Sequence, residues 1–303
     1  MENEHWSKAF LKQEISSISP LNEGGQHKID LITLIDKSKW ICKKFSPQTW
    51  LGPTNVEELK LSEALATEVA DKLGISLSAY RWHGSPILKI NEQPAMIVPY
   101  CEGECLVEFS EHQSFLLGNR LAEIHLLKPF STSAKPFPAI ILAKEEQYPS
   151  WLEQLAIHCN SYRYYEEEKW VFSHRDIHAS NIVWPDIERP HLIDWESAGL
   201  IHPTVELIGL AANCAGLALC KFLPGHFKAA LLGYGQLIGY LPKIDSILWE
   251  LTLHSWLLWF AYSLRQGWEK EAKQTLESIE LIKNKMEDLK QIYAAVYSSF
   301  YQK

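Results

Sequence analysis

The chain lacks paired cysteines, an excess of basic residues and any long apolar run. Its six cysteines form no CxxC pair, which argues against a zinc or redox motif and predicts reduced thiols in the cytoplasm. The formal net charge of -8 argues against non-specific binding to nucleic acid. The longest apolar stretch, residues 207–219, contains Asn213 and is too short to span a bilayer. We therefore expect a buried helix there, no membrane association and, since the first residues lack the pattern of a signal peptide, no export.

The hydrophobic pattern changes period near residue 100. Before that point the pattern predicts three strands and one helix, the strands over residues 28–35, 40–45 and 95–100 and the helix over residues 58–73, before Gly74. From about residue 111, apolar side chains recur at helical spacing. The sequence therefore predicts an α+β fold of two lobes with a ligand cleft between them. The expected boundaries are 1–101 for a β-rich N-terminal lobe and 102–303 for a mostly helical C-terminal lobe.

One segment in the middle of the chain carries a chemical signature. His174, Arg175 and Asp176 are followed by Asn181, with four residues between Asp176 and Asn181, which is the spacing of a kinase catalytic loop. A carboxylate at Asp176 can accept the proton of an acceptor hydroxyl, so His174 is expected to support the loop. Asn181 and Asp194 offer the oxygen ligands that Mg²⁺ prefers. The alternative is that these residues only form turns and hairpins.

The same segment resembles a known group, the aminoglycoside phosphotransferases, choline kinases and thiamine kinases. Residues 173–182, SHRDIHASNI, are similar to its H-x-D-x-H-x-x-N-[IL] loop, and residues 192–199, LIDWESAG, resemble the IDWE-x-A-G form of its metal-binding segment. That form is more typical of thiamine and choline kinases. Glu206, in a P-x-x-[DE]-L element, and His125, in an L-x-x-L-H helix, also match the group.

The resemblance implies a protein-kinase-like fold and ATP- and Mg²⁺-dependent transfer of a phosphoryl group to a small-molecule alcohol. In it Asp176 would be the catalytic base, and Asn181 and Asp194 would bind the metal. Protein kinases proper fit less well, because Asp194 is followed by Trp195 and not by Phe-Gly.

The resemblance also implies a nucleotide site in the N-terminal lobe. The turn at Gly24 and Gly25 could bring backbone N–H groups to the phosphates, although a plain hairpin turn fits the sequence equally well. The hinge between the lobes would hold the adenine through its backbone. The hinge residues expected to do so are Val98, Tyr100 and Cys101.

A strand lysine that contacts the phosphates is the other part of this site. By resemblance it would be Lys43, with Lys44 as the alternative, because neighbouring residues of a strand face opposite ways. Its ion-pair partner on the following helix would be Glu63, with Glu68 as the alternative.

The acceptor substrate is the least constrained part of the prediction. Trp256, with Trp249 and Trp259, could present aromatic faces to a cation such as choline or thiamine, although their near-helical spacing fits a buried core better. Glu196 could contact the substrate or orient the site. Three functions stay open: a kinase for a small cationic alcohol, an aminoglycoside phosphotransferase with a more acidic pocket, and a non-catalytic nucleotide-binding pseudokinase. The intact set of Asp176, Asn181 and Asp194 favours an enzyme.

Overall fold

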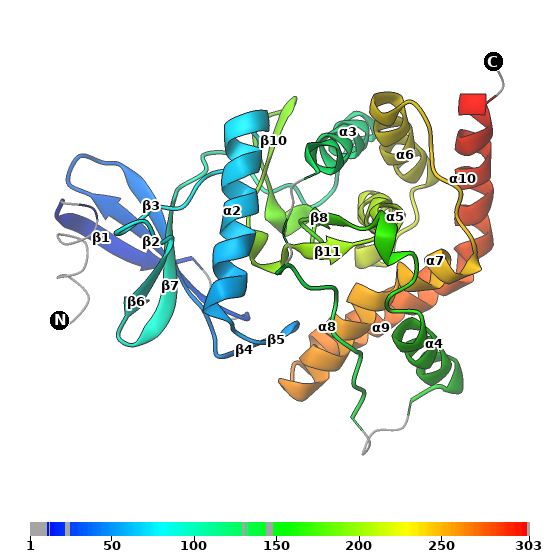
Figure 1. Cartoon of the computed structure of the whole chain (residues 1–303), viewed down its shortest axis with the longest axis horizontal. Coiled ribbons are helices and arrows are strands. Elements are labelled where there is room, and N and C mark those ends of the chain that lie inside the picture. The colour runs from blue at the N-terminus through cyan, green and yellow to red at the C-terminus, as the bar shows by residue number, and fades with distance from the viewer. Residues whose placement is uncertain are drawn as a thin grey trace.

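An antiparallel sheet forms the N-terminal part of the molecule, at the left of Figure 1. The computed structural model describes residues 11, 13–21, 25–128, 131, 133–143 and 148–301. Within them the sheet has the strand order β1-β2-β3-β7-β6. The strands are β1 Ile15–Pro20, β2 Lys28–Leu34, β3 Lys39–Lys44, β6 Ile87–Ile90 and β7 Gln93–Pro99. The strands predicted over residues 28–35, 40–45 and 95–100 are confirmed within two residues, and β1 and β6 are additional.

One long helix, α2, lies between strands β3 and β6 of the sheet along the chain. A short hairpin, β4 Gln48–Thr49 with β5 Gly52–Pro53, leads to α2 Val56–Leu73. The side chain of Asn55 caps its start by accepting hydrogen bonds from the backbone N–H groups of Glu57 and Glu58 (2.9 and 3.3 Å). Gly74 ends the helix in the left-handed conformation (φ 67°), as the sequence predicts.

The rest of the chain is mainly helical, at the right of Figure 1. Its helices are α3 Glu111–Leu127, α4 Ser150–Ser161, α5 Pro203–Cys214, α6 Pro224–Ile238, α7 Ser246–Leu251, α8 His254–Arg265, α9 Glu269–Asn284 and α10 Met286–Tyr301. Two small antiparallel pairs lie among them, β8 Val171–Ser173 with β11 Gly199–Ile201 and β9 Ile182–Asp186 with β10 Arg189–Leu192. The α+β fold is therefore confirmed. None of the described helices is long and apolar enough to cross a membrane.

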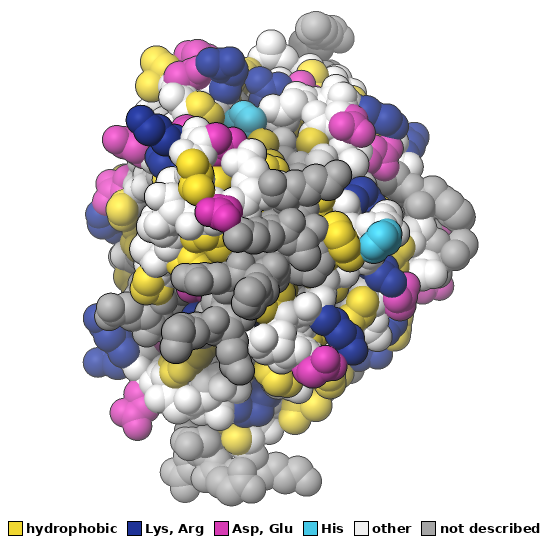
Figure 2. Space-filling model, turned by 90° about the vertical axis from the view of Figure 1, so that its left-hand side faces the viewer, with side chains coloured by type: hydrophobic (Ala, Val, Ile, Leu, Met, Phe, Trp, Pro, Cys, Tyr) yellow, Lys and Arg dark blue, Asp and Glu magenta, His cyan; other side chains and the backbone are white. Residues whose placement is uncertain are grey.

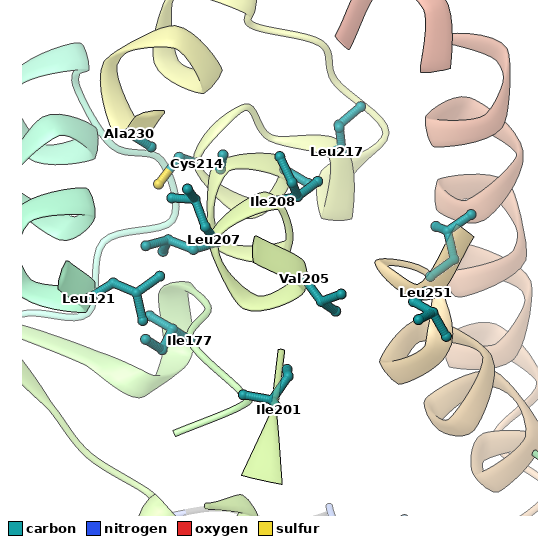
Figure 3. Close-up of a cluster of buried hydrophobic side chains, with 14 of the residues drawn as sticks. Leu121, Ile177, Ile201, Val205, Leu207, Ile208, Cys214, Leu217, Ala230 and Leu251 are labelled. Atoms are coloured by element: carbon teal, nitrogen blue, oxygen red, sulfur yellow. The ribbon is translucent and has the colours of Figure 1, made fainter. Parts of the chain in front are cut away.

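The main hydrophobic core lies around α5 (Figure 3). Leu207 of α5, Leu121 of α3 and Ile177, which follows β8, belong to one buried cluster. The helix predicted over residues 207–219 is wrong in its bounds. It begins at Pro203 and ends at Cys214, because Gly216 turns the chain with a positive φ of 77°. Ile177 thus anchors the loop after β8 to the hydrophobic core.

Helices α3 and α6 approach each other at two glycines. A Cβ on Gly118 of α3 would collide with the carbonyl oxygen of Ala230, and a Cβ on Gly233 of α6 would collide with that of Phe115. The two helix backbones are therefore in direct contact at positions where any side chain would push them apart.

The segment after β7 joins the two parts of the chain. The backbone N–H of Tyr100 donates to the carbonyl of Lys39 (3.1 Å), and Glu104 exchanges two backbone hydrogen bonds with Trp184 of β9 (3.1 and 2.9 Å). Gly103 allows this approach, since a Cβ there would lie 2.6 Å from the Trp184 oxygen. The lobe boundary expected at residues 101 and 102 falls in this segment and stays a prediction.

Figure 2 shows the end of the molecule that carries the sheet. On the described part of this face, positive and negative side chains are interspersed.

Candidate active site

The loop between β8 and β9 is held by a buried histidine. His174 donates from Nε2 to the carbonyl of Ile193 (3.0 Å) and accepts at Nδ1 from the backbone N–H of Asp176 (3.3 Å). Burial lowers the pKa of His174, which favours the neutral ring that this pattern requires. His174 therefore ties the loop to the strand that precedes Asp194, in the supporting role expected for it.

Arg175 fixes the loop from the other side. It has a left-handed backbone (φ 67°), and its guanidinium donates to the carbonyls of Ser197 (2.6 Å, from Nε) and Lys135 (3.0 Å, from Nη1). The same group lies 4.6 Å from the ring centre of Phe137. Its backbone N–H donates to Oε1 of Glu206 (2.6 Å). Both the guanidinium and the backbone N–H of Arg175 are therefore engaged in contacts that hold the loop.

Glu206 joins two distant matches of the sequence analysis. Its Oε2 lies 2.9 Å from Nε2 of His125 on α3, and Nδ1 of His125 lies 2.9 Å from the Tyr234 hydroxyl on α6. Burial alone would raise the pKa of Glu206, but the hydrogen bond and charge of His125 lower it below its usual value. The ionised carboxylate therefore connects α3, α5 and α6 to the backbone of Arg175.

Asp176 and Asn181 meet at the top of the loop. The Asn181 amide nitrogen donates to the backbone oxygen of Asp176 (3.0 Å) and to its carboxylate oxygen Oδ2 (3.3 Å). Nε2 of His178 lies 3.6 Å from the other carboxylate oxygen. The Asp176 carboxylate is one-third exposed (31%), which leaves it accessible to a substrate.

Asp194 lies beside Asn181 and pairs with Lys43. The backbone N–H of Ile193 donates to the Asn181 carbonyl (3.0 Å), and Asp194 itself has a left-handed backbone (φ 65°). Lys43 forms ion pairs with Asp194 and with Glu196. Burial would raise the pKa of Asp194, but the charge of Lys43 outweighs it and lowers the pKa to about 2. Burial and the neighbouring Asp194 charge raise the pKa of Glu196.

A cavity of about 600 Å³ collects half of the predicted site residues. Those that line it are Lys43, Asp176, Asn181, Asp194, Glu196 and Trp256. The lining does not include Gly25, Glu63 or the three hinge residues Val98, Tyr100 and Cys101, and Gly24 lies outside the described residues. The spacing of the sequence pattern therefore brings the chemical groups together in space, while the nucleotide assignments of the hinge and the glycine turn stay predictions.

The lysine and glutamate alternatives of the sequence analysis are separated by their partners. Lys44 pairs with the buried Asp30 (3.4 Å) on the other face of the sheet, so only Lys43 reaches the cavity. Glu63 does not contact Lys43, contrary to expectation. It accepts from the backbone N–H of Ala79 (2.5 Å) and from the Thr67 hydroxyl (3.2 Å). Glu68, the alternative, pairs with Lys72 on the helix surface (2.6 Å).

The predicted hinge residues belong to the sheet and the joining segment. Val98 pairs with Ile41 across β7 and β3, and Cys101 is partly exposed beyond the strand end. Val98 thus lies in the strand that pairs with the strand of Lys43, and the adenine contact expected at these residues stays a prediction.

Helices α8 and α9 form part of the cavity wall. Trp256 and Trp259 are half-buried, and the indole nitrogen of Trp259 donates to Glu271 (3.2 Å). The aromatic residues between 249 and 260 therefore have two environments. Trp249 and Phe260 are in the core, whereas Trp256 and Trp259 line the cavity. Glu271 and Asn213, whose amide donates to the Ile177 carbonyl (2.9 Å), were not predicted. No local pattern could have identified them, since both lie on ordinary helices.

The described lining is rich in acidic groups. It carries five carboxylates and two basic side chains: Asp176, Asp194, Glu196, Glu206 and Glu271 against Lys43 and Arg175. Both basic groups are already engaged, Lys43 by two carboxylates and Arg175 by two carbonyls. The described lining therefore carries an excess of negative charge.

Comparison with known proteins gives a family match and several structural relatives. The model of the phosphotransferase enzyme family matches residues 31–240. No curated protein matches the sequence.

The structural relatives include three kinases of small molecules. Amicoumacin kinase hAmiN, solved with AMP-PNP, Ca²⁺ and Ami, has a TM-score of 0.63 at 14% identity, with 88% of each chain covered. Choline kinase LicA from Streptococcus pneumoniae has a TM-score of 0.61 at 15% identity, covering 92% of this chain and 96% of its own. An ethanolamine kinase from Plasmodium vivax has a TM-score of 0.58 at 14% identity, covering 87% and 80%. At this identity the likeness establishes the kinase-like fold.

Proposed function

The chain belongs to the phosphotransferase enzyme family and phosphorylates small-molecule hydroxyl groups, and from that premise we propose that it transfers the γ-phosphate of ATP, with Mg²⁺, to a small cationic alcohol such as choline or thiamine. The observation that carries the proposal is the cavity whose lining brings together Asp176, Asn181, Asp194 and Lys43 with Trp256.

The Lys43 end suits a metal-bound triphosphate. Asp194 and Asn181 offer one ionised carboxylate and one amide oxygen, the hard oxygen donors that Mg²⁺ accepts together with phosphate oxygens and water. The Asn181 nitrogen is occupied by Asp176, which leaves its oxygen as the free acceptor for a cation. The residues therefore fit the metal, which would neutralise phosphate charge when bound. Lys43 would bind the phosphates from β3.

Asp176 is proposed as the base that receives the acceptor proton. Its carboxylate is accessible, and Asn181 orients it through a hydrogen bond to Oδ2. His174 cannot take this role, since it is fully buried and both ring nitrogens are engaged. A positioned carboxylate within reach of the hydroxyl supplies general-base catalysis.

The acceptor is proposed to lie against Trp256 and Trp259. The faces of tryptophan rings attract cations, and Glu271 adds a negative charge beside them. Two of the structural relatives are named for choline and ethanolamine, which are both cationic alcohols. The carboxylate of Glu196 is already engaged by Lys43 and His27, so the substrate contact expected of this residue stays a prediction.

The test is Mg²⁺-dependent ATP consumption with thiamine, choline, ethanolamine, homoserine and several aminoglycosides as acceptors. The uncharged carbon isostere of choline serves as the matched control for the cation. We expect turnover with a cationic alcohol, little with the isostere, and a loss of about two orders of magnitude or more in Asp176→Asn with nucleotide affinity retained.

The other outcomes select among the alternatives. Turnover with aminoglycosides alone would favour an antibiotic phosphotransferase, a function that the five carboxylates of the cavity would also suit. Nucleotide binding without turnover of any acceptor would favour a pseudokinase. Equal turnover of choline and its isostere would contradict the cation site.

A further inference from the structure

Lys43 is held between two carboxylates in the candidate active site. Its ammonium forms ion pairs with Asp194 and Glu196, and its side chain is only 7% exposed. A buried ammonium group needs such partners, because leaving it unpaired away from water is costly. Asp194 is also the proposed metal ligand, so it is not available as a lasting partner for Lys43 once a metal is bound.

Glu196 has a second set of partners that keeps it in place. Its other oxygen, Oε1, accepts from Nε2 of His27 (2.6 Å) and from the amide of Gln26 (3.1 Å). Both residues precede β2, so the carboxylate joins the start of the sheet to the segment that carries Asp194.

His27 and Gln26 are themselves fixed to the chain around β3. His27 accepts at Nδ1 from the backbone N–H of Ser46 (3.0 Å) and packs edge-on against Phe45, with 5.2 Å between ring centres. The Gln26 side-chain oxygen accepts from the backbone N–H of Trp50 (2.9 Å). Glu196 is thereby positioned relative to the strand of Lys43 itself.

The helix carboxylate that kinases use for this purpose is engaged elsewhere. Glu63 on α2 is buried, and it accepts from the backbone N–H of Ala79 and from Thr67. Among the described residues, Glu196 is the buried carboxylate beside Lys43 that other side chains hold in place.

We propose that Glu196, held by His27 and Gln26, is the residue that positions Lys43 for the nucleotide phosphates, in place of a glutamate on α2. The inference rests on the proposed function, since it assigns a nucleotide to the Lys43 end of the cavity. Glu196 acts through Lys43, so it is a positioning residue.

A double-mutant cycle on nucleotide affinity tests this assignment. The variants are Glu196→Gln, Lys43→Met and their combination, and the readout is binding of a fluorescent ATP analogue with saturating Mg²⁺ and without acceptor. We expect each single substitution to weaken binding by about tenfold and the double variant to bind as Lys43→Met does, because coupled residues are not additive. Removing the negative charge of Glu196 acts alike in both backgrounds, so the cycle isolates the part that depends on Lys43.

Two further pairs sharpen the result. Glu63→Gln exchanges the buried helix carboxylate for its amide, and we expect no coupling between it and Lys43→Met. His27→Leu should weaken binding with Glu196 present and have no effect in Glu196→Gln, while His27→Gln, which keeps an N–H donor, should restore part of the affinity.

The contrary outcomes are distinct. An equal effect of Glu196→Gln in both Lys43 backgrounds, or coupling of Lys43 to Glu63, would overturn the assignment. Thermal unfolding checks each variant, and Lys43→Gln, which also removes the charge, replaces Lys43→Met if the latter does not fold. Phosphoryl transfer by the wild type without coupling would leave the proposed function standing and remove the inference. Coupling without transfer to any acceptor would do the reverse.

Discussion

At the residue scale, two left-handed side-chain-bearing residues flank the candidate site. Arg175 (φ 67°) precedes Asp176, and Asp194 (φ 65°) follows β10. Such a backbone costs about 1–3 kcal/mol per residue and persists only where the surroundings fix it. Arg175 is fixed by two carbonyls and Glu206, and Asp194 by Lys43. This strain is located next to the proposed base, Asp176, and at the proposed metal ligand, Asp194.

The proposed metal role of Asp194 predicts a changed Mg²⁺ requirement. Asp194→Asn removes the charge of a carboxylate whose pKa is lowered to about 2, so the site loses its ionised donor. We expect the half-saturating Mg²⁺ concentration for ATP turnover to rise about tenfold or more, which is about 1.4 kcal/mol in affinity. A Mg²⁺ titration at fixed ATP measures it.

The matched control for this titration is Asp186→Asn. Asp186 is an aspartate of the β9–β10 hairpin, which precedes Asp194, and it is paired with the exposed Arg189 (2.5 Å). Its variant should keep the wild-type Mg²⁺ requirement. An unchanged requirement in Asp194→Asn would remove Asp194 from the metal site.

How far the site could be predicted depends on distance along the chain. Asp176 and Asn181 share one loop, so their spacing determines their encounter, and Asp194 follows the next hairpin. The partner of Lys43 is different, because Glu196 lies more than 150 residues away and no local pattern links the two. Position on α2 favoured Glu63, but a nearby backbone N–H, that of Ala79, takes up its carboxylate instead.

At the scale of elements, helix α3 and helix α6 depend on two glycines for their contact. The added methyl group of Gly118→Ala would meet the carbonyl of Ala230, which belongs to the backbone and cannot turn aside. We expect a loss of about 1–3 kcal/mol in the free energy of unfolding, which thermal or denaturant unfolding would detect.

Gly209 on α5 provides the matched control for the glycine contact. A Cβ there meets no atom within 4 Å, so Gly209→Ala should be neutral or stabilise the helix by up to about 1 kcal/mol. If Gly118→Ala were as stable as Gly209→Ala, the two backbones could not be in the contact described.

The elements that sequence patterns missed are those that depend on a neighbour. Strand β1, ISSISP, is half serine and mostly exposed, and it forms because it pairs with β2 at the edge of the sheet. Strand β6 is four residues long and pairs with β7. Longer elements with a clear period, α2 and β2 among them, were predicted because one of their faces is buried.

At the scale of the whole molecule, buried histidines make stability depend on pH. His254 on α8 donates to the carbonyl of Pro138 (2.8 Å) and stacks on Phe137, and burial lowers its pKa from 6.5 to about 4. The unfolded chain takes up a proton at this residue near pH 6.5, while the folded protein resists protonation until about pH 4. The contribution of His254 is therefore present above pH 6.5 and is lost as the pH falls from 6.5 toward 4.

The expected size follows from the shift. At 1.36 kcal/mol per pKa unit, His254 makes the protein up to about 3 kcal/mol less stable at pH 4 than at pH 7. Denaturant unfolding across this range should show a shallower slope for His254→Gln, which can still donate to Pro138 but does not titrate. Parallel curves for the variant and the wild type would contradict the low pKa of His254.

The wall of the cavity is built from stretches that follow one another along the chain. Lys43 comes from the first hundred residues and the loop residues from the middle, while the tryptophan-bearing wall comes from the stretch between Thr252 and Ser278. On the proposed assignment, phosphoryl transfer and acceptor choice are therefore encoded in separate parts of the gene. Recombination confined to the later part can retarget the enzyme to a new alcohol and leave its chemistry inherited unchanged.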